Sequence, residues 1–408
     1  MRAIVTGQIG MDKKPYLRQV ADLAGQTGEQ GGITLYNIGD MMYNEGKDVR
    51  PGRILDLPIS RLNSLRRAAF KDVITSSASH KNIIVNTHAT FRWRHGLFSA
   101  FDFDQITAMK PDVFICLVDN IEVVHNRLHR DFDLDATLKD CMVWREEEIL
   151  ATEILSQAVP GSKFYIVSRG RHIPTTRTTF RLVCRPNMKK VYPSFPMSHV
   201  VDLPDIVQEI DEFRAALAEH FITFDPGDVD EKILLDRAVA KAKEGKVDEW
   251  LDWGSPALRA GSDSPTLRVG SGGSGMGEKE HHAERGGTQS PNPQRVRVRE
   301  VLDIAGDIDG QIYMRDFKLI DQSDMIVSLV PEIPGIGGKD IPGLSSGVER
   351  ELQHAWEHTK EVYVVWKPKK NPSPFITETA TKIFRSVQEA LSYFEEKNMF
   401  GEKNLFGH

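Results

Sequence analysis

Short apolar runs alternate with amphipathic stretches along most of the chain. In the first half, RAIVTG, KNIIVNTHA, PDVFICLVD and KFYIVSRG have the length and character of buried strands. Between them, segments such as PYLRQVADLAGQ and LNSLRRAAFKDVI repeat apolar residues every three to four positions, as helices do. This alternation predicts an α/β fold in which helices cover both faces of a parallel sheet.

A second series of the same kind begins near residue 189. KKVYPSFPMSHVV opens this series. ITFDP, SDMIVSLV and EVYVVW predict strands, whereas IVQEIDEFRAALAEHF and LLDRAVAKAKEGKVDEWLDW predict helices. Residues 254–294 interrupt this series, and their Gly, Ser and Pro content with few large apolar residues predicts a flexible insertion. We therefore expect two α/β domains, over residues 1–185 and 189–397, with the insertion inside the second.

The composition narrows the class of protein. A length of 408 residues is suited to two domains, and 40% apolar with 27% charged residues is typical of soluble globular proteins. The formal charge of −6 gives no general attraction to nucleic acid or to anionic membranes, and no apolar run reaches the length of a membrane span. We therefore expect neither nucleic acid nor a membrane as a partner.

Cysteine and histidine usage predicts no metal site. The three cysteines, Cys116, Cys141 and Cys184, cannot all pair and lack metal-ligand spacing. The adjacent His281 and His282 fall in the predicted insertion, so we interpret them as solvated loop residues. With no signal peptide before the first strand, these features predict a cytoplasmic protein.

The segment VTGQIGMDKKPY follows the first predicted strand and opens a helix. Glycines at such a place let backbone N–H groups and the helix N-terminus bind phosphate, while a lysine reaches the outer phosphates. Gly7, Gly10 and Lys13 occupy the positions of the first Gly, the middle Gly and the Lys of a P-loop. Asp12 and Lys14 depart from that pattern, because they replace a Gly and the Ser or Thr that binds Mg²⁺. Lys14 is still expected among the nucleotide-binding residues.

Together with LYNIGDMMYNEG, IIVNTHATFRWRHG and KFYIVSRG, this segment resembles the archaeal-type adenylate kinases over roughly residues 1–170. The resemblance implies a nucleoside monophosphate pocket at Gly39 and Asp40, and lid arginines at Arg127 and Arg130. Asn86 stands where that family usually has an Asp before Thr-His-Ala.

Phosphoryl transfer depends on positioned Mg²⁺ and cationic groups, and Lys14 and Asn86 alter the metal-handling positions. Three alternatives therefore stay open for the first domain. It is an active kinase that uses ATP and Mg²⁺, a nucleotide-binding or sensing domain that has lost transfer, or a fold whose loop binds no nucleotide.

The stretch GLSSGVERELQHAWEHTK places a carboxylate in a helical face that should be apolar. A helix from Val348 has its apolar stripe at Val348, Leu352, Ala355 and Trp356. Glu351 falls inside this stripe, whereas Glu349 points away from it. A charge that breaks a packing pattern is expected where function overrules packing, although a Glu paired with a nearby cation gives the same pattern.

Three segments of the second half resemble the nucleoside 2-deoxyribosyltransferase superfamily, including its nucleoside 5′-monophosphate N-glycosidase branch, over residues 189–397 without the insertion. KKVYPSFPM places Tyr192 where a tyrosine orients the catalytic carboxylate, and YMRDFKLIDQSDMIVSLV places Asp316 as the acid that contacts the base, with Asp324 mainly structural. SSGVERELQHA places Glu351 as the nucleophile. The resemblance implies a Rossmann-like, flavodoxin-like second domain and a homo-oligomer.

One position bears on the substrate. Nucleoside-processing members carry an Asp six residues before the nucleophile, and this chain has Ser345 there. Hydroxyls and amides at a helix N-terminus accept a phosphate that a carboxylate would repel. We therefore expect a 5′-phosphate held by Ser345, Ser346 and Gly347, with Ser194 contributing from the first strand, although Ser345 also suits an ordinary helix cap.

The leading hypothesis is hydrolysis of the N-glycosidic bond of a nucleoside 5′-monophosphate, which releases the base and ribose or deoxyribose 5-phosphate, or transfer of that glycosyl group to another base. This step needs no cofactor, and the expected partners are small-molecule nucleotides. Two alternatives remain: a nucleoside monophosphate kinase whose C-terminal domain only binds nucleotides, and a nucleotide sensor in which neither site turns over.

Overall fold

The structure, a computed structural model, describes nine stretches of the chain. They are residues 1–29, 31–50, 52–93, 96–132, 134–170, 175–197, 200–253, 295–335 and 339–400. The predicted insertion, with His281 and His282, lies outside the described residues. Below, the part of the chain up to residue 184 is termed the first domain and the part from residue 190 onward the second domain.

The first domain is built on a five-stranded parallel sheet in the order β2-β3-β1-β6-β7. Its strands are β1 (Arg2–Thr6), β2 (Thr34–Asn37), β3 (Ile83–Asn86), β6 (Val113–Val118) and β7 (Lys163–Ser168). The four predicted strands of this half are β1, β3, β6 and β7. The sequence pattern missed β2, because all four of its residues are only half-buried at the edge of the sheet and form no apolar run.

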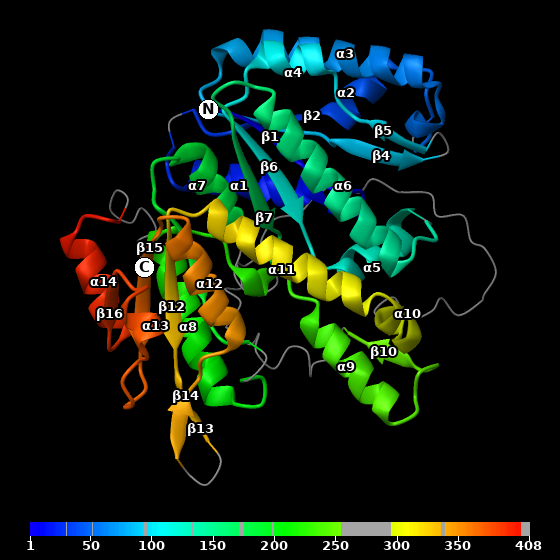
Figure 1. The fold of residues 1–408 in the computed structure, drawn as a ribbon. Coiled ribbons are helices and arrows are strands. Elements are labelled where there is room, and N and C mark those ends of the chain that lie inside the picture. The colour runs from blue at the N-terminus through cyan, green and yellow to red at the C-terminus, as the bar shows by residue number, and fades with distance from the viewer. Residues whose placement is uncertain are drawn as a thin grey trace, which may run out of the picture.

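Helices cover both faces of this sheet (Figure 1). They are α1 (Lys13–Gln26), α2 (Ile38–Glu45), α3 (Ile59–Ser76), α4 (Phe103–Met109), α5 (Ile121–Phe132), α6 (Leu138–Gln157) and α7 (Thr176–Cys184), with 3-10 turns at Ile54–Asp56 and Ser77–Ser79. The helices α3 and α4 share one buried cluster with the sheet, and α1 and α7 share another. A short antiparallel pair, β4 (Thr90–Trp93) and β5 (Gly96–Ser99), follows β3.

The second domain has its own five-stranded sheet, in the order β16-β15-β12-β8-β9, and all of its strand pairs are parallel. Its strands are β8 (Lys190–Ser194), β9 (Ile222–Thr223), β12 (Met325–Val330), β15 (Glu361–Trp366) and β16 (Lys382–Phe384). From β8 the chain passes to β9 on one side, and it later returns to β12 on the other side. In open parallel sheets, ligands bind outside the carboxyl ends of the strands at such a switch point.

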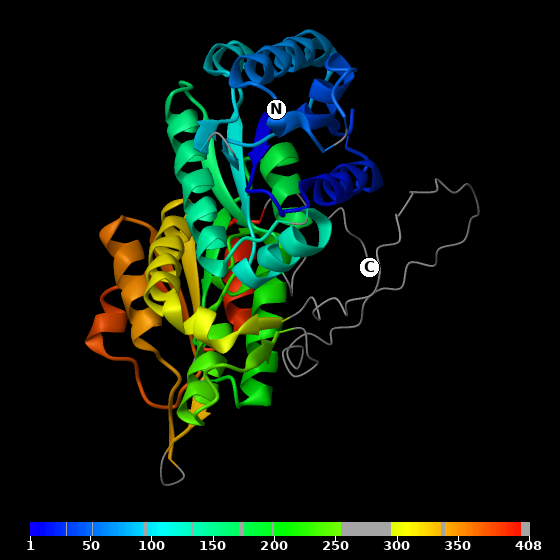
Figure 2. The ribbon, with the colours of Figure 1, turned by 90° about the vertical axis from the view of Figure 1, so that its right-hand side faces the viewer.

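The helices of this domain are α8 (Pro204–His220), α9 (Lys232–Lys243), α10 (Val298–Asp303), α11 (Ala305–Asp321), α12 (Ser346–Glu357), α13 (Pro374–Thr377) and α14 (Val387–Glu396), with a 3-10 turn at Pro226–Asp228. Side chains of α8 and α14 pack on one face of the sheet, and those of α11 and α12 on the other. Two antiparallel pairs complete it, β10 (Trp250–Asp252) with β11 (Arg295–Arg297) and β13 (Glu332–Pro334) with β14 (Asp340–Pro342). The β13–β14 pair projects from the body of the domain (Figure 2).

Two details of the sequence analysis were wrong. The helix predicted to reach the tryptophans near residue 253 ends at Lys243, because Gly245 turns the chain with a φ of 78° and residues 250–252 pair with β11. Trp356, predicted in the apolar stripe of α12, is 52% exposed, because it lies at the rim of a stripe that Val348, Leu352 and Ala355 already fill. Glu349 is exposed, as predicted.

The two domains share one continuous buried cluster. Along their junction α6 and α11 lie side by side (Figure 1). Arg145 on α6 donates to Gln311 of α11 at 2.7 Å, and Lys318 of α11 pairs with Glu153 of α6 at 2.6 Å. Among the helices in the described ranges, none is both long and apolar enough to span a bilayer.

Candidate functional site

The loop between β1 and α1 requires glycine at two of the predicted phosphate-binding positions. Gly7 has a φ of +142°, and a Cβ there would lie 2.8 Å from the carbonyl oxygen of Leu117. Gly10 has a φ of +86°, which side chains rarely adopt. The tight backbone path that the sequence motif predicted is therefore present.

Lys13 begins α1 and is buried inside this loop. Its Nζ donates to the carbonyl oxygen of Gly7 at 2.5 Å and lies 3.2 Å from the ring nitrogens of His88. Burial lowers the pKa of Lys13 to about 8, against the opposing influence of the Glu148 carboxylate. Burial, reinforced by the charge of Lys13, also holds the pKa of His88 well below its ordinary value, so this imidazole is neutral.

A cavity of about 600 Å³ opens between this loop, α2 and the segment after β3. Gly10, Lys13, Lys14, Gly39 and Asp40 line it, which brings together five of the predicted nucleotide-binding residues. Lys14 and Asp40 form an ion pair across it. The volume is in the range of small-molecule sites and suits a nucleotide.

The two predicted lid arginines lie differently. Arg127 donates to the carbonyl oxygen of Gly10 at 3.2 Å and to the Asp119 carboxylate at 2.9 Å, so it is fixed beside the loop. Arg130 is 54% exposed and pairs at 2.6 Å with its neighbour Asp131. The structure therefore brings Arg127 to the loop, and Arg130 stays on the surface.

Several buried polar atoms at this cavity have no hydrogen-bond partner among the residues that the structure describes. They are both side-chain polar atoms of Gln8 and Oδ1 of Asn86, whose amide nitrogen donates to Asn37 at 2.9 Å. Buried polar atoms are normally paired, so these atoms favour a polar ligand. The set fits nucleotide phosphates better than Mg²⁺, because Lys14 and Asn86 leave only an amide oxygen where a hydroxyl and a carboxylate are usual.

Glu148, which the sequence analysis missed, is the buried support of this loop. From α6 its carboxylate accepts from the backbone N–H groups of Gly7 at 3.0 Å, Ala89 at 2.8 Å and Thr90 at 2.8 Å. The Thr90 hydroxyl donates a fourth hydrogen bond at 2.8 Å. In the run REEEIL, the spacing of apolar residues does not distinguish Glu148 from its exposed or half-buried neighbours.

In the second domain, Glu351 lies in the first turns of α12 opposite the carboxyl end of β8. The Tyr192 hydroxyl donates to Oε1 of Glu351 at 3.0 Å, and the Ser194 hydroxyl donates to Oε2 at 2.6 Å. Both donors are fully buried, and alternation along the strand puts them on the same face of the sheet. The structure thus brings Glu351 and Tyr192 together, and gives Ser194 a different partner from the phosphate that we expected.

Burial raises the pKa of Glu351 to about 7, although the hydrogen bonds from Ser194 and Tyr192 act in the opposite direction. Asp316 projects from α11 close enough for the Glu351 charge to act on it. Burial, aided by Glu351 and opposed by Arg315, holds the pKa of Asp316 well above its ordinary value. Its Oδ1 is buried and has no hydrogen-bond partner within the described part of the chain. The raised pKa of Asp316 favours its protonated form, and Glu351, with a pKa of about 7, is partly ionised near neutral pH.

The N-terminus of α12 combines a cap with exposed residues. The Ser345 hydroxyl accepts from the N–H of Val348 at 3.2 Å, so it acts as the helix cap, while Ser346 and Gly347 are exposed.

Asp324 lies at the other edge of the second sheet, just before β12. Its carboxylate accepts from the backbone N–H of Lys190 at 2.8 Å and joins β12 to β8.

A buried ionic network, also missed by the sequence analysis, connects the two domains. Glu231 pairs with Arg145 of α6 at 2.5 Å and with Arg315 of α11 at 3.5 Å. Arg145 also donates to the carbonyl oxygen of Asp119, whose carboxylate holds Arg127. These partners come from segments far apart in the sequence, so no local sequence pattern predicts the ion pairs.

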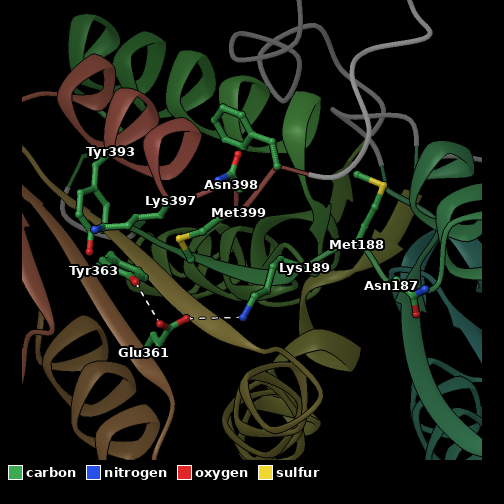
Figure 3. Close-up of a pocket in the computed structure, with 10 residues that line it drawn as sticks. Asn187, Met188, Lys189, Glu361, Tyr363, Tyr393, Lys397, Asn398 and Met399 are labelled. Carbon is green, nitrogen blue, oxygen red and sulfur yellow. Dashed lines mark hydrogen bonds and ion pairs between the residues drawn. The ribbon is translucent and has the colours of Figure 1, made fainter.

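Two further cavities lie at opposite ends of β8. One, of about 330 Å³, begins at Phe195, directly after Ser194, and is bounded by α8 and α9. The other, of about 410 Å³, lies at the amino ends of β8 and β15, where Glu361 contacts Lys189 and Tyr363 (Figure 3). Ligands of open parallel sheets bind at the carboxyl ends of the strands. The cavity at the amino ends of β8 and β15 therefore lies on the opposite edge of the sheet from the predicted chemistry.

Comparisons with known proteins bear on the first domain. A family model described as an AAA domain matches residues 6–139. The chain is similar to the adenylate kinase of Pyrococcus furiosus, with 25% identity over 161 residues, which are 38% of this chain and 76% of that protein. A shikimate kinase structure from Bacteroides thetaiotaomicron shares 11% identity at a TM-score of 0.28, over 41% of this chain and 86% of that one. The first domain is a P-loop kinase-like domain that resembles adenylate kinase.

Proposed function

We propose that the second domain cleaves the N-glycosidic bond of a nucleoside 5′-monophosphate, with Glu351 as the nucleophile. The observation that carries this proposal is the carboxylate of Glu351 held by the hydroxyls of Tyr192 and Ser194, at 3.0 and 2.6 Å, beside the switch point of the second sheet. The strand order, counted within this sheet alone, is 2-1-3-4-5, which supports a flavodoxin-like domain.

The proposed chemistry has two steps. An oxygen of Glu351 attacks C1′ of the sugar while the C1′–N bond breaks, and Asp316 gives its proton to the departing base nitrogen. Water then attacks C1′ of the resulting ester, which frees Glu351 and yields the sugar 5-phosphate and a proton. If a second base attacks in place of water, the same intermediate gives transfer. The pKa of Asp316 is raised, which favours the protonated acid, and the pKa of Glu351 is about 7, which allows an ionised nucleophile near neutral pH. Both support this division of roles.

Three residues have positioning or binding roles in this scheme. Tyr192 and Ser194 hold the Glu351 carboxylate in a single orientation, which is a different role for Ser194 from the phosphate contact expected from sequence. The 5′-phosphate is placed at the N-terminus of α12, where Ser346 and Gly347 are exposed and the helix dipole favours an anion. Ser345 contributes by capping that helix.

The first domain gives a second candidate function, nucleotide binding with or without phosphoryl transfer. Gly7, Gly10 and Lys13 would hold the phosphates of ATP, and Gly39 and Asp40 a monophosphate. Asn86 is the residue available to contact Mg²⁺, which would neutralise charge on the transferring phosphoryl group. The unpartnered atoms of Gln8 and Asn86 favour a bound nucleotide over an empty loop.

Product analysis separates these functions. The full chain is incubated with each nucleoside and deoxynucleoside monophosphate, with and without ATP and Mg²⁺, and products are resolved by chromatography. Release of free base without ATP supports the glycosidase, whereas ATP-dependent formation of a diphosphate without free base supports the kinase. Tight nucleotide binding with neither product would favour a sensor and would overturn the leading proposal.

A further inference from the structure

A cluster of three metal-ligating side chains lies away from both sites described above. Asp321 is the last residue of α11, and His354 and His358 lie at the end of α12. One ligand atom from each of these residues lies within 4.8 Å of the others. The ends of α11 and α12 therefore meet at a point where a single ion would contact side chains from both helices.

The two histidines are held in place for coordination. His354 and His358 are four residues apart and so share one face of the helix end, the spacing that zinc-binding helices use. The ring of His354 stacks on Phe317 at 4.3 Å, and its Nε2 lies 2.8 Å from Oδ1 of Asp321. Nδ1 of His358 lies 2.8 Å from the carbonyl oxygen of His354, a bond that leaves its Nε2 for a metal.

The surroundings allow an ion to enter. Asp321 and His358 are exposed, and His354 is half-buried. Lys360, a cation beside Asp321, donates to the carbonyl oxygens of Asp321 at 2.9 Å and Ser323 at 2.6 Å, so its ammonium group is engaged by the backbone. Two imidazoles and one carboxylate suit Zn²⁺ and related transition metals rather than Mg²⁺ or Ca²⁺, with water in the remaining positions.

We infer that Asp321, His354 and His358 form a surface site for Zn²⁺ or a similar transition-metal ion that joins the ends of α11 and α12. These helices carry Asp316 and Glu351, and Glu351 precedes His354 by three residues. If the proposed glycosidase function is correct, the ion also fixes the two helices that present its acid and its nucleophile. The metal site itself stands without that function.

The test is zinc titration of tag-free, EDTA-treated full-length protein, followed by calorimetry and thermal unfolding. We expect Zn²⁺ to bind and raise the melting temperature, and H354A/H358A to lower the affinity at least about tenfold. Asp321→Asn keeps an acceptor for His354 but is a poor ligand, so it should weaken zinc binding while the metal-free protein melts at the wild-type temperature.

The control is H281A/H282A, which removes the chain's adjacent histidine pair and should leave zinc binding unchanged. Wild-type affinity in H354A/H358A, or loss of binding in H281A/H282A alone, would overturn the inference, as would a wild-type chain that binds no zinc. Because binding is read without substrate, these results do not depend on whether base release occurs.

Discussion

Ser194 donates a hydrogen bond of 2.6 Å to Glu351, although 157 positions separate the two residues in the chain. The contact joins the last residue of β8 to the second turn of α12, and Tyr192 donates to the other oxygen of the same carboxylate. A half-buried carboxylate with two buried hydroxyl donors has a fixed orientation and a perturbed pKa, which are the properties of a nucleophile rather than of a surface glutamate.

The pH dependence of base release should report the ionisation of Glu351. Since its pKa is raised to about 7 and the nucleophile must be ionised, kcat/KM should rise with pH through that value. Tyr192→Phe and Ser194→Ala each remove a hydrogen bond that lowers this pKa, so the rising limb should move to higher pH. Ser328→Ala is the control, because Ser328 neighbours Ser194 on the adjacent strand without hydrogen-bonding through its hydroxyl. A rising limb at the same pH in all variants would contradict the assignment.

Replacement of Glu351 should stabilise the fold at alkaline pH. The folded-state pKa lies above the ordinary value of 4.5, so the contribution of this group to stability is present below 4.5 and is lost as pH rises through about 7. Glu351→Gln stays neutral, so at pH 8 its free energy of unfolding should exceed that of wild type by at most about 3 kcal/mol, measured by thermal unfolding. At pH 4 it should show no gain. Glu349→Gln, on the exposed face of the same helix, should show no such pH-dependent gain.

The residues around Glu351 show which parts of the second domain's candidate site can be predicted from sequence. The interruption of an apolar stripe predicts Glu351 as a site residue, and the resemblance of short segments to a known family predicts Tyr192 and Asp316. The structure brings Tyr192 to Glu351. The contact between Ser194 and Glu351 was not found, since it depends on how α12 packs across the sheet. The prediction that Trp356 is buried was wrong for a related reason. Periodicity gives the direction in which a side chain leaves the helix, but not the width of the helix face that packs against the sheet.

Nucleotide binding by the first domain should weaken above pH 8. Lys13 must be charged to hold phosphate, and burial lowers its pKa to about 8, so the free protein loses this charge as pH rises through that value. Calorimetric titration with ATP in buffers of different ionisation enthalpy should show proton uptake at pH 8. Lys13→Met should abolish both the binding and the uptake, whereas Lys71→Met, at an exposed position of α3, should change neither. Equal affinity at pH 7 and pH 9 would contradict the role of Lys13.

The network around Glu231 should be the main ionic contribution at the domain junction. Removal of one partner from a buried ion pair costs about 3–5 kcal/mol, because the remaining charge is left uncompensated. Glu231→Gln should therefore destabilise the chain by about that amount in urea unfolding, since it leaves Arg145 and Arg315 buried. Glu249→Gln, which breaks the exposed pair with Lys241, should cost about 1 kcal/mol or less.

The same network has a pH signature. Although burial alone would raise it, the charges of Arg145 and Arg315 lower the pKa of Glu231 to about 2. Its contribution is therefore present above the ordinary value of 4.5 and is lost as pH falls toward 2. The stability difference between wild type and Glu231→Gln should shrink over that interval, and a difference that is constant from pH 7 to pH 3 would contradict this account.

Most strands of the two sheets could be predicted from the sequence, whereas the buried contacts that Glu148, Glu231 and Arg145 make could not. Strands β1, β3, β6, β7, β12 and β15 are apolar runs that need no tertiary information to recognise. Glu148, Glu231 and Arg145 lie in helical or loop segments whose local pattern gives no sign that they are buried. Their roles arise from partners up to 166 residues away, as between Arg145 and Gln311, and only the folded chain defines those partners.

The most direct test of the central claim compares two substitutions on one helix. Base release from the best nucleoside monophosphate is measured for wild type, Glu351→Gln and Glu349→Gln under the same conditions. Loss of a covalent nucleophile should lower the rate of Glu351→Gln by at least about a thousandfold, while Glu349→Gln keeps the wild-type rate. A Glu351→Gln variant that releases base as fast as wild type would show that the chemistry does not use this carboxylate.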